Sequence, residues 1–327
     1  MSEPADLHDN SARSIDRVAV VGCGVVGAGW AATFLARNLQ VTCVDPAAGA
    51  EARLRDGVAA DLRLLQLDQA RIDAALDALR FEPDLAKGVR DADWVQENGP
   101  ETETIKRQLI AAISRAAPDH AVIASSTSSI TVSAMQADAV RPERVVLGHP
   151  FIPVPLMALV EVVGGDLTAP AAIDRAIAFY RSIGKSPIRL KREAPGHVAN
   201  RLQAALMREA FHLLQEGVAS AEDIDLALTE GPGQRWAVSG PFVSHHLAGG
   251  EGGARRAFEH LGPALQAMWE NLGAPKLTAE LQQKVIDEIA QGLAVRGSHE
   301  RAAERAHVLR AIRHAKKTFK EGWGDND

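Results

Sequence analysis

The sequence has few cysteines and no excess of basic residues, and both shortages exclude classes of protein. Cysteine occurs only 2 times in 327 residues, which excludes a disulfide-stapled scaffold and favours a reducing compartment such as the cytoplasm. Lysine and arginine total 36 against 42 acidic residues, a net charge of −6. General nucleic-acid binding needs a basic footprint, so we expect no nucleic-acid partner.

The chain also lacks an uninterrupted apolar run that would predict a membrane span. Residues 18–36 carry no charge, and a span needs about 20 such residues. Glycines 22, 24, 27 and 29 interrupt this stretch, and each costs about 1 kcal/mol in a helix relative to alanine. Residues 1–16 are polar and lack the basic n-region of a signal peptide. We therefore expect a disordered lead-in over 1–16 and no membrane partner.

Short β-branched runs alternate with helical patterns over the first part of the chain. Strands are expected at 17–21, 40–44, 93–97, 121–124, 144–147, 158–163 and 187–190. Helices are expected over 25–38, 47–80, 101–116 and from Thr168 onward. This order predicts a doubly wound, mostly parallel sheet over 17–193. Residues 194–327 show helical periodicity throughout, which predicts an all-α domain that binds substrate and, through its surplus of apolar faces, forms a homodimer.

One glycine motif follows the first expected strand. Gly22-Cys-Gly24-Val-Val-Gly27 matches G-x-G-x-x-G and opens a helix, the context that makes this pattern informative. Gly22 allows the tight turn, Gly24 lets the backbone approach a diphosphate, and Gly27 lets helix and strand pack closely. The N–H groups at the helix start, at Val25 and Val26, would face the phosphates. A simple glycine turn in another α/β protein is the alternative.

Asp45 ends the second expected strand. A carboxylate there accepts hydrogen bonds from both ribose hydroxyls and repels a 2′-phosphate, so NAD is favoured over NADP. The alternative is a helix N-cap before Pro46.

Four residues are candidates for proton chemistry: Ser128, His149, Glu161 and Asn200. His149 follows a strand at the edge where open α/β sheets bind ligands. Glu161 lies in the apolar run 156–163, and a buried acid needs a partner, for which His149 is a candidate. Taken alone, His149 is equally well explained as a structural histidine.

Several motifs together resemble one family. Ser125-Ser-Thr-Ser-Ser129, Gly148-His-Pro-Phe-Ile-Pro153, Leu159-Val-Glu-Val-Val163 and Pro195-Gly-His-Val-Ala-Asn-Arg201 follow the glycine motif in that order. The whole resembles the L-3-hydroxyacyl-CoA dehydrogenase family over about residues 17–290. The resemblance implies that His149 is a general base paired with Glu161, that Ser128 and Asn200 lie near the substrate oxygen, and that Glu97 and Ser125 contact NAD. A related class, the 3-hydroxyisobutyrate-type dehydrogenases, uses a lysine on the first helix after the sheet, and residues 195–216 contain none.

Departures from the family pattern bear on the substrate. Residues 46–80 are short and contain no lysine that could face coenzyme A, Ile152 replaces an asparagine, and His197 replaces a phenylalanine. The segment 231–242 resembles the non-CoA branch, which includes L-carnitine dehydrogenases, L-gulonate 3-dehydrogenases and lambda-crystallins. This implies NAD-dependent oxidation of a small L-3-hydroxy acid.

In that branch the pair Arg235 and Trp236 is expected at the substrate. Arg235, expected in a Gly-Pro-Gly loop, would bind the substrate carboxylate, and Trp236 would form an apolar wall or face a trimethylammonium group. Equally well, Arg235 would tie the loop to a helix C-terminus or to the partner subunit. The alternatives are a 3-hydroxyacyl-CoA substrate and a crystallin-like structural protein. The pair His245-His246 predicts no metal site, because adjacent helical residues point in different directions.

Overall fold

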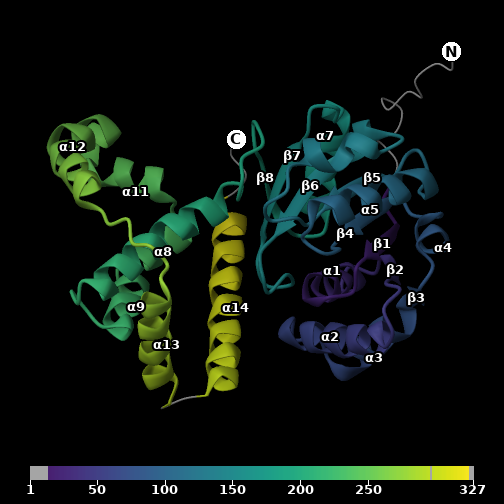
Figure 1. Ribbon diagram of the computed structural model, residues 1–327, viewed down its shortest axis with the longest axis horizontal. Helices are drawn as coiled ribbons and strands as arrows, with labels where there is room; N and C mark the ends of the chain where they lie inside the picture. The colour runs from purple at the N-terminus through teal and green to yellow at the C-terminus, as the bar shows by residue number, and fades with distance from the viewer. Residues whose placement is uncertain (1–13, 295–296, 324–327) are drawn as a thin grey trace. The chain divides into compact units, whose positions relative to one another are not determined.

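The computed structural model describes residues 14–294 and 297–323. The chain divides into two compact units, Met1–Asn200 and Arg201–Asp327 (Figure 1). The sequence prediction places the boundary at 193/194, so it assigns the segment 194–200 to the helical part. Hydrogen bonds from the backbone N–H groups of Val198 and Ala199 to the Glu161 carboxylate join that segment to the sheet. These bonds explain why the first unit extends to Asn200.

The first unit contains one eight-stranded sheet with the order β3-β2-β1-β4-β5-β6-β7-β8. Its strands are β1 (Arg17–Val21), β2 (Gln40–Val44), β3 (Arg80–Glu82), β4 (Trp94–Glu97), β5 (Val122–Ser125), β6 (Val145–Pro150), β7 (Leu159–Gly164) and β8 (Ser186–Arg189). Neighbouring strands are parallel except for the antiparallel pair β6–β7. The predicted doubly wound, mostly parallel sheet is confirmed. The strand order reverses between β1 and β4, and ligands bind at such a switch point.

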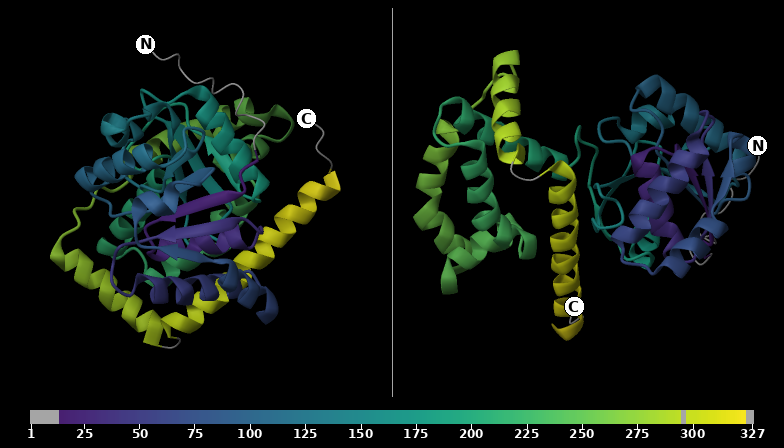
Figure 2. Two further views of the ribbon diagram at one scale, coloured as in Figure 1. Left: turned by 90° about the vertical axis from the view of Figure 1, so that its right-hand side faces the viewer. Right: turned by 90° about the horizontal axis from the view of Figure 1, so that it is seen from below.

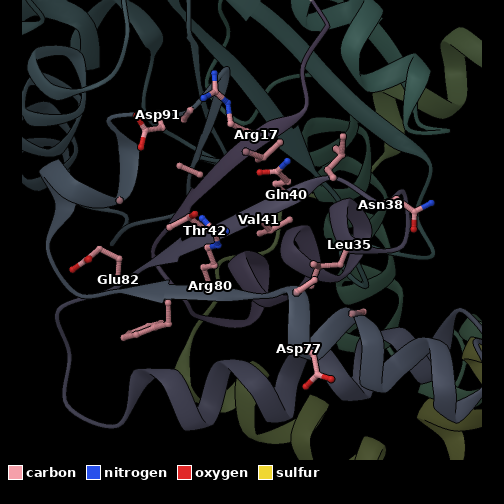
Figure 3. A pocket seen from close by; sticks show the side chains of 18 of the residues that line it. Arg17, Leu35, Asn38, Gln40, Val41, Thr42, Asp77, Arg80, Glu82 and Asp91 are labelled. Atoms are coloured by element: carbon pink, nitrogen blue, oxygen red, sulfur yellow. The ribbon is translucent and has the colours of Figure 1, made fainter.

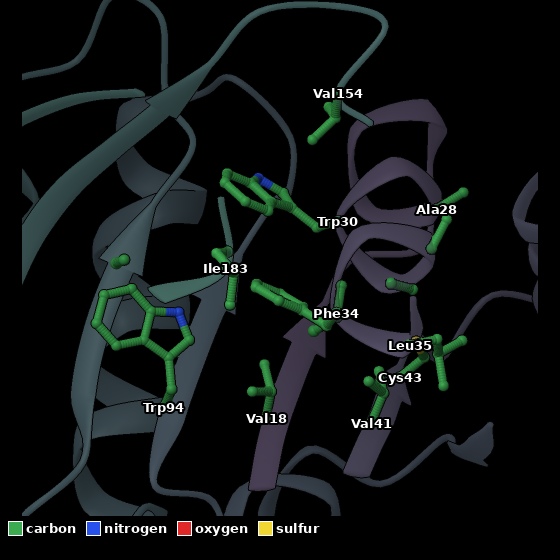
Figure 4. Close-up of a cluster of buried hydrophobic side chains, with 14 of the residues drawn as sticks. Val18, Ala28, Trp30, Phe34, Leu35, Val41, Cys43, Trp94, Val154 and Ile183 are labelled. Carbon is green, nitrogen blue, oxygen red and sulfur yellow. The ribbon is translucent and has the colours of Figure 1, made fainter. Parts of the chain in front are cut away.

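Helices cover both faces of this sheet. They are α1 (Val25–Leu35), α2 (Ala50–Leu64), α3 (Gln69–Ala78), α4 (Leu85–Val89), α5 (Glu103–Ala116), α6 (Val132–Met135) and α7 (Pro170–Ser182), with short 3₁₀ turns at Gln136–Asp138 and Pro142–Arg144. Val18 and Val20 face the layer of α1, α2, α3 and α7, whereas Ala19 and Val21 face the layer of α4, α5 and α6. Figure 4 shows Trp30 and Phe34 of α1 among the buried side chains of the first layer. Burial on both faces explains why the strand sequences are continuously apolar.

The second unit is helical, as predicted. It contains most of α8 (Ala199–Gln215), then α9 (Ala221–Glu230), α10 (Pro232–Val238), α11 (Pro241–Ala248), a 3₁₀ turn at Gly250–Gly252, α12 (Gly253–Asn271), α13 (Ala279–Ala294) and α14 (Ser298–Trp323). Ser220 caps α9, because its Oγ accepts from the Asp223 N–H at 3.1 Å and donates to Oδ2 of Asp223 at 2.7 Å. Figure 2 shows these helices from two further directions. No helix in the described ranges combines the length and hydrophobicity that a membrane crossing requires.

The predicted disordered lead-in over 1–16 falls largely on residues that the structure does not describe. Residues 1–13 lie outside the described residues. Asp16 already belongs to the fold, because its carbonyl accepts a hydrogen bond from the Gln40 N–H at 2.9 Å.

Candidate active site

The glycine loop between β1 and α1 has the shape of a phosphate cradle. Gly22 has φ +90°, and a Cβ there would lie 2.7 Å from the carbonyl oxygen of Asn98. A Cβ on Gly27 would lie 1.9 Å from the carbonyl oxygen of Gly22. At Gly24 a Cβ would meet nothing within 4 Å, so the N-terminus of α1 opens toward free space. The loop therefore fits a dinucleotide diphosphate, with the N–H groups of Val25 and Val26 at the open end of the helix.

Asp45, just after β2, lies against this loop. Its Oδ2 accepts from the Cys23 N–H at 2.9 Å and its Oδ1 accepts from the Ala47 N–H at 2.9 Å. Each carboxylate oxygen accepts more than one hydrogen bond, so both atoms keep capacity for ribose hydroxyls. The N-cap alternative is wrong, because the next helix, α2, begins at Ala50 with Gly49 as its N-cap residue.

The antiparallel register of β6 and β7 places His149 directly opposite Glu161. The imidazole Nδ1 lies 2.9 Å from Glu161 Oε2, and both side chains are buried. Opposite residues of an antiparallel pair have Cβ atoms about 4.5–5.5 Å apart, so the strand pairing alone sets this contact. The pairing of these two residues, first suggested by burial and by family resemblance, has a direct structural cause.

Glu161 is held in place by the start of α8. Its Oε1 accepts from the N–H groups of Val198 and Ala199, each at 2.9 Å. Burial raises the pKa of Glu161, but the hydrogen bonds from His149, Ala199 and Val198 outweigh burial and lower that pKa. The carboxylate is therefore ionised at neutral pH, and it accepts the Nδ1–H of His149. Nε2 is then the ring nitrogen that can exchange a proton with a substrate.

Ser128 lies on the other side of His149, with its Oγ 3.2 Å from Nε2. Glu101 organises the loop that carries it. Oε1 of Glu101 accepts from the Ser128 N–H at 2.8 Å, the Ser129 N–H at 2.9 Å and Thr127 Oγ1 at 2.6 Å. Burial raises the pKa of Glu101, but the bonds from Thr127 and Ser129 and the charge of Lys106 outweigh it and lower the pKa.

Glu97 and Ser125, which the family resemblance places at the cofactor, lie in the interior of the first unit. Both side chains are fully buried, and Ser125 Oγ donates to Glu97 Oε2 at 2.5 Å. Lys106 Nζ, also buried, lies 3.1 Å from Glu97 Oε1. The carboxylate is thus engaged in an interior ion pair, and its oxygens are turned away from solvent. These residues support the loops at the sheet edge. Lys106 and Glu101 could not be predicted from a motif, because neither belongs to a recognised one; only their place after β4 indicates them.

The remaining candidates lie on helices. Asn200 is half-buried and follows Ala199, whose N–H binds Glu161. Arg235 and Trp236 belong to the second unit and are exposed on α10. The expected Gly-Pro-Gly loop at Arg235 is wrong, because Pro232 starts a helix there, a position that suits the fixed φ of proline.

A cavity of about 760 Å³ opens elsewhere, where β1, β2 and β3 begin. Arg17, Gln40 and Arg80, each the first residue of its strand, line it (Figure 3). Parallel sheets bind ligands at the opposite, carboxyl edge, where the dyad and the glycine loop lie. Within 14–294 and 297–323, no group of three or more His, Cys, Asp or Glu side chains is placed to hold a metal.

One edge of the sheet thus presents both a phosphate cradle and a buried base aimed at an open serine. That combination defines a dinucleotide-dependent dehydrogenase. The chain belongs to the 3-hydroxyacyl-CoA dehydrogenase family: the NAD-binding domain of that family matches residues 17–194, and its C-terminal domain matches residues 196–295. The predicted family, the NAD cofactor and the enzyme class are confirmed.

The chain is similar to characterised relatives over most of its length. L-carnitine dehydrogenase of Streptomyces coelicolor is 48% identical over 288 residues, which cover 87% of this chain and 91% of the relative. L-carnitine dehydrogenase of Bacillus cereus is 46% identical over 281 residues, 86% of each chain. A solved structure, the NAD⁺-dependent 5-formyl-3-hydroxy-2-methylpyridine 4-carboxylic acid 5-dehydrogenase, is 29% identical with a TM-score of 0.77, covering 93% of this chain and 99% of that one.

Proposed function

We propose that this protein oxidises the L-3-hydroxyl group of L-carnitine to the 3-keto acid with NAD. The buried pair of His149 and Glu161, with Nε2 facing the exposed Ser128, is the observation that carries the reaction type. The identity to L-carnitine dehydrogenases across both units supports the substrate.

The chain's own residues handle the proton. His149 Nε2 takes the proton of the substrate hydroxyl as general base. Glu161 accepts Nδ1–H and stabilises the resulting imidazolium. Ser128 and Asn200 hold the reacting oxygen. Residues 22–27 and Asp45 hold NAD, which, when bound, supplies the hydride acceptor.

The two ends of L-carnitine call for different partners. Arg235 would pair with the carboxylate through its planar guanidinium. Trp236 would offer a cation–π face to the trimethylammonium group. Both side chains are exposed on α10, so neither is already engaged in the interior of its own unit.

An acyl-CoA substrate is the second candidate. It is disfavoured because arginines of α2 that could bind its phosphates are engaged by groups of the protein. Arg55, an arginine otherwise suited to phosphate, binds Glu51 at 2.9 Å and the Leu76 carbonyl at 2.9 Å. Arg53 binds the Ala48 carbonyl at 3.1 Å. A crystallin-like structural role needs no base, whereas the His149–Glu161 geometry is complete.

We also infer a cytoplasmic homodimer assembled through the second unit. Only two cysteines occur, and both are free and buried, which fits a reducing compartment. Apolar side chains stand exposed on α11 and α12, including Phe242 at 89% and Phe258 at 60%. Large apolar side chains exposed on two helices that pack against each other are typical of an interface.

A substrate screen tests the proposal. Purified protein with NAD is supplied with L-carnitine, L-gulonate, 3-hydroxybutyrate or 3-hydroxybutyryl-CoA, and the absorbance of the reduced cofactor is followed. We expect the highest kcat/KM with L-carnitine. A higher value with the CoA ester would overturn the proposal.

Arg235→Ala tests how the acid is recognised. Loss of one charge-assisted contact should raise KM for L-carnitine by about 10–100-fold, while KM for NAD stays unchanged. Arg255→Ala, which removes an exposed arginine of α12 in the same unit, is the matched control. Equal effects of Arg235→Ala on both substrates would indicate a structural role instead.

A further inference from the structure

His197 stands in a strained and buried position beside the dyad. Its backbone is left-handed, with φ +52° directly after Gly196 at φ +72°. Its side chain is buried, with 4% exposure. A non-glycine residue keeps such a conformation only when its surroundings fix it, and such residues gather at functional sites.

The protonation state of the His197 ring follows from its one hydrogen bond. Nε2 lies 3.1 Å from the carbonyl oxygen of Thr127. A carbonyl only accepts, so Nε2 carries the proton. Burial lowers the pKa of the imidazole by more than this bond raises it, so the ring is neutral and Nδ1 is a bare acceptor. Nδ1 is buried without a hydrogen-bond partner in the described part of the chain.

Burying the unpaired Nδ1 acceptor is unfavourable. A histidine at this position must therefore offer an advantage over an apolar ring. A phenyl ring, the usual residue of the family motif at this position, would fill the same space with no stranded nitrogen. The advantage of histidine over phenylalanine is therefore the Nε2–H donor to Thr127.

The bond to Thr127 joins the two backbone segments that hold the dyad from opposite sides. Thr127 precedes Ser128, whose Oγ contacts His149 Nε2 at 3.2 Å. His197 precedes Val198 and Ala199, whose N–H groups hold Glu161. The ring itself packs on His149, with ring centroids 5.0 Å apart.

We infer that His197 is a positioning residue of this dehydrogenase, and that its hydrogen bond to Thr127 sets the spacing between the Ser128 loop and the start of α8. With that spacing fixed, Ser128 and Glu161 keep His149 oriented toward the hydroxyl of the substrate. For its choice of substrate, the inference rests on the proposed oxidation of L-carnitine.

Three variants separate the hydrogen bond from the volume of the ring. His197→Phe keeps a planar ring but removes the donor. His197→Gln keeps an amide donor at the reach of Nε2. His197→Asn is too short to reach Thr127 but tolerates the positive φ, so it replaces the Phe variant if that variant does not fold. His120→Phe is the matched control, because it removes a histidine bond of 3.1 Å to Asp93 at the opposite edge of the sheet.

The kinetic result is a split between kcat and KM. His197→Phe should lower kcat by roughly tenfold or more, since small misplacements of catalytic groups reduce rates strongly. KM for L-carnitine and for NAD should stay within about twofold, and His197→Gln should recover kcat to within about threefold. His120→Phe should leave kcat unchanged. Normal kcat in His197→Phe, or failure of His197→Gln to recover it, overturns the inference.

Amide hydrogen exchange gives a readout that needs no turnover. Exchange at Val198 and Ala199 should be roughly tenfold faster in His197→Phe and normal in His197→Gln, because the bonds to Glu161 open more often. Unchanged exchange in His197→Phe overturns the inference. If the wild type fails to oxidise L-carnitine, the substrate proposal fails, and the exchange result still decides the role of His197.

Discussion

His149 Nδ1 contacts the buried carboxylate of Glu161, and Nε2 contacts the exposed Ser128. This asymmetry makes Nε2 the nitrogen that takes the substrate proton. Replacing His149 by Asn should lower kcat by roughly 10²–10⁴-fold, the range for loss of a general base. Glu161→Gln should also be severe, because an amide neither carries the charge that stabilises the imidazolium nor fixes the tautomer.

Stopped-flow or steady-state turnover with L-carnitine measures the effect of these changes, and fluorescence titration measures NAD binding, which should survive. His260→Asn, on the exposed surface of α12, is the control. Near-normal turnover in His149→Asn would show that the proton leaves by another group. The pKa of Glu161 is lowered, so this carboxylate stays ionised on mild acidification. Protonation of Glu161 should therefore cause no loss of rate in that pH range.

We expect Asp45 to set the choice between NAD and NADP, and its two hydrogen bonds complicate the test. Asp45→Ala removes the repulsion of a 2′-phosphate but also releases the Cys23 N–H. Asp45→Asn removes the charge and retains an acceptor for that N–H. We expect kcat/KM for NAD over NADP to fall in both variants, with the glycine loop better preserved in Asp45→Asn. Comparable use of both cofactors by the wild type would contradict the prediction.

For single residues, the sequence identifies those that belong to recognised motifs. It does not identify a residue whose partner lies on another helix or strand. Residues 22–27, Asp45 and His149 stand in recognisable contexts. Glu97 was expected at the cofactor because it matches by position the NAD-contacting acid of the family, and this role stays a prediction. Its buried partner Lys106 lies on α5, and no spacing rule links the two. The strained backbone of His197 is equally invisible in the sequence.

Among elements, the strands with continuous apolar runs and the glycine breaks between helices could be predicted, since both depend on local chemistry. β3 was missed because its three residues, Arg80–Glu82, continue a helical pattern that precedes them. Its pairing with β2 decides its conformation. The antiparallel register of β6 and β7 brings the dyad together, and register depends on tertiary contacts that a single sequence does not display.

Asp93 joins the starting ends of three strands. Its carboxylate binds the backbone N–H and the guanidinium of Arg17, at the start of β1, and His120, just before β5. Burial raises the pKa of Asp93, but the hydrogen bonds from Arg17 and His120 outweigh it and lower the pKa to about 2. A lowered pKa in the folded state stabilises the fold above the unfolded-state pKa of about 3.9, and this stabilisation is lost as the pH falls through about 2.

Asp93→Asn should therefore lower the free energy of unfolding at pH 7 by about 1–3 kcal/mol, the value of hydrogen bonds to a charged group. The difference from wild type should shrink as the pH is lowered from 5 toward 2.5, since the unfolded-state carboxylate, with a pKa of about 3.9, then takes up a proton that the folded state, with a pKa of about 2, does not. Urea unfolding across this range measures it. Asp91→Asn, at an exposed neighbour that forms an ion pair with the exposed Arg90 at 3.3 Å, is the control. A difference that stays constant with pH would show that packing, not charge, is responsible.

For the whole molecule, the alternation of strands and helices followed by helices alone was enough to predict the two-part architecture. Composition supported this by excluding disulfide scaffolds and nucleic-acid binders. The oligomeric state belongs to the same scale, because it depends on surfaces. The second unit leaves apolar side chains of α11 and α12 in solvent, with Phe242, Leu247 and Phe258 at 89%, 65% and 60% exposure. A stable dimer buries about 1,200–2,000 Å² in total, and an apolar surface on two packed helices is suited to form its centre.

We therefore expect the wild type at micromolar concentration to show twice the chain mass of 34.9 kDa in light scattering after gel filtration. Phe242→Glu should shift it toward the monomer, because a charge buried at the centre of an apolar interface loses its hydration. Val140→Glu, at an exposed apolar position of the first unit with 61% exposure, should leave the dimer intact. A monomeric wild type would contradict the predicted dimer. A dimer that is insensitive to Phe242→Glu but broken by Val140→Glu would place the interface elsewhere. If dissociation also lowers kcat without changing NAD binding, the second unit needs its partner to hold the substrate.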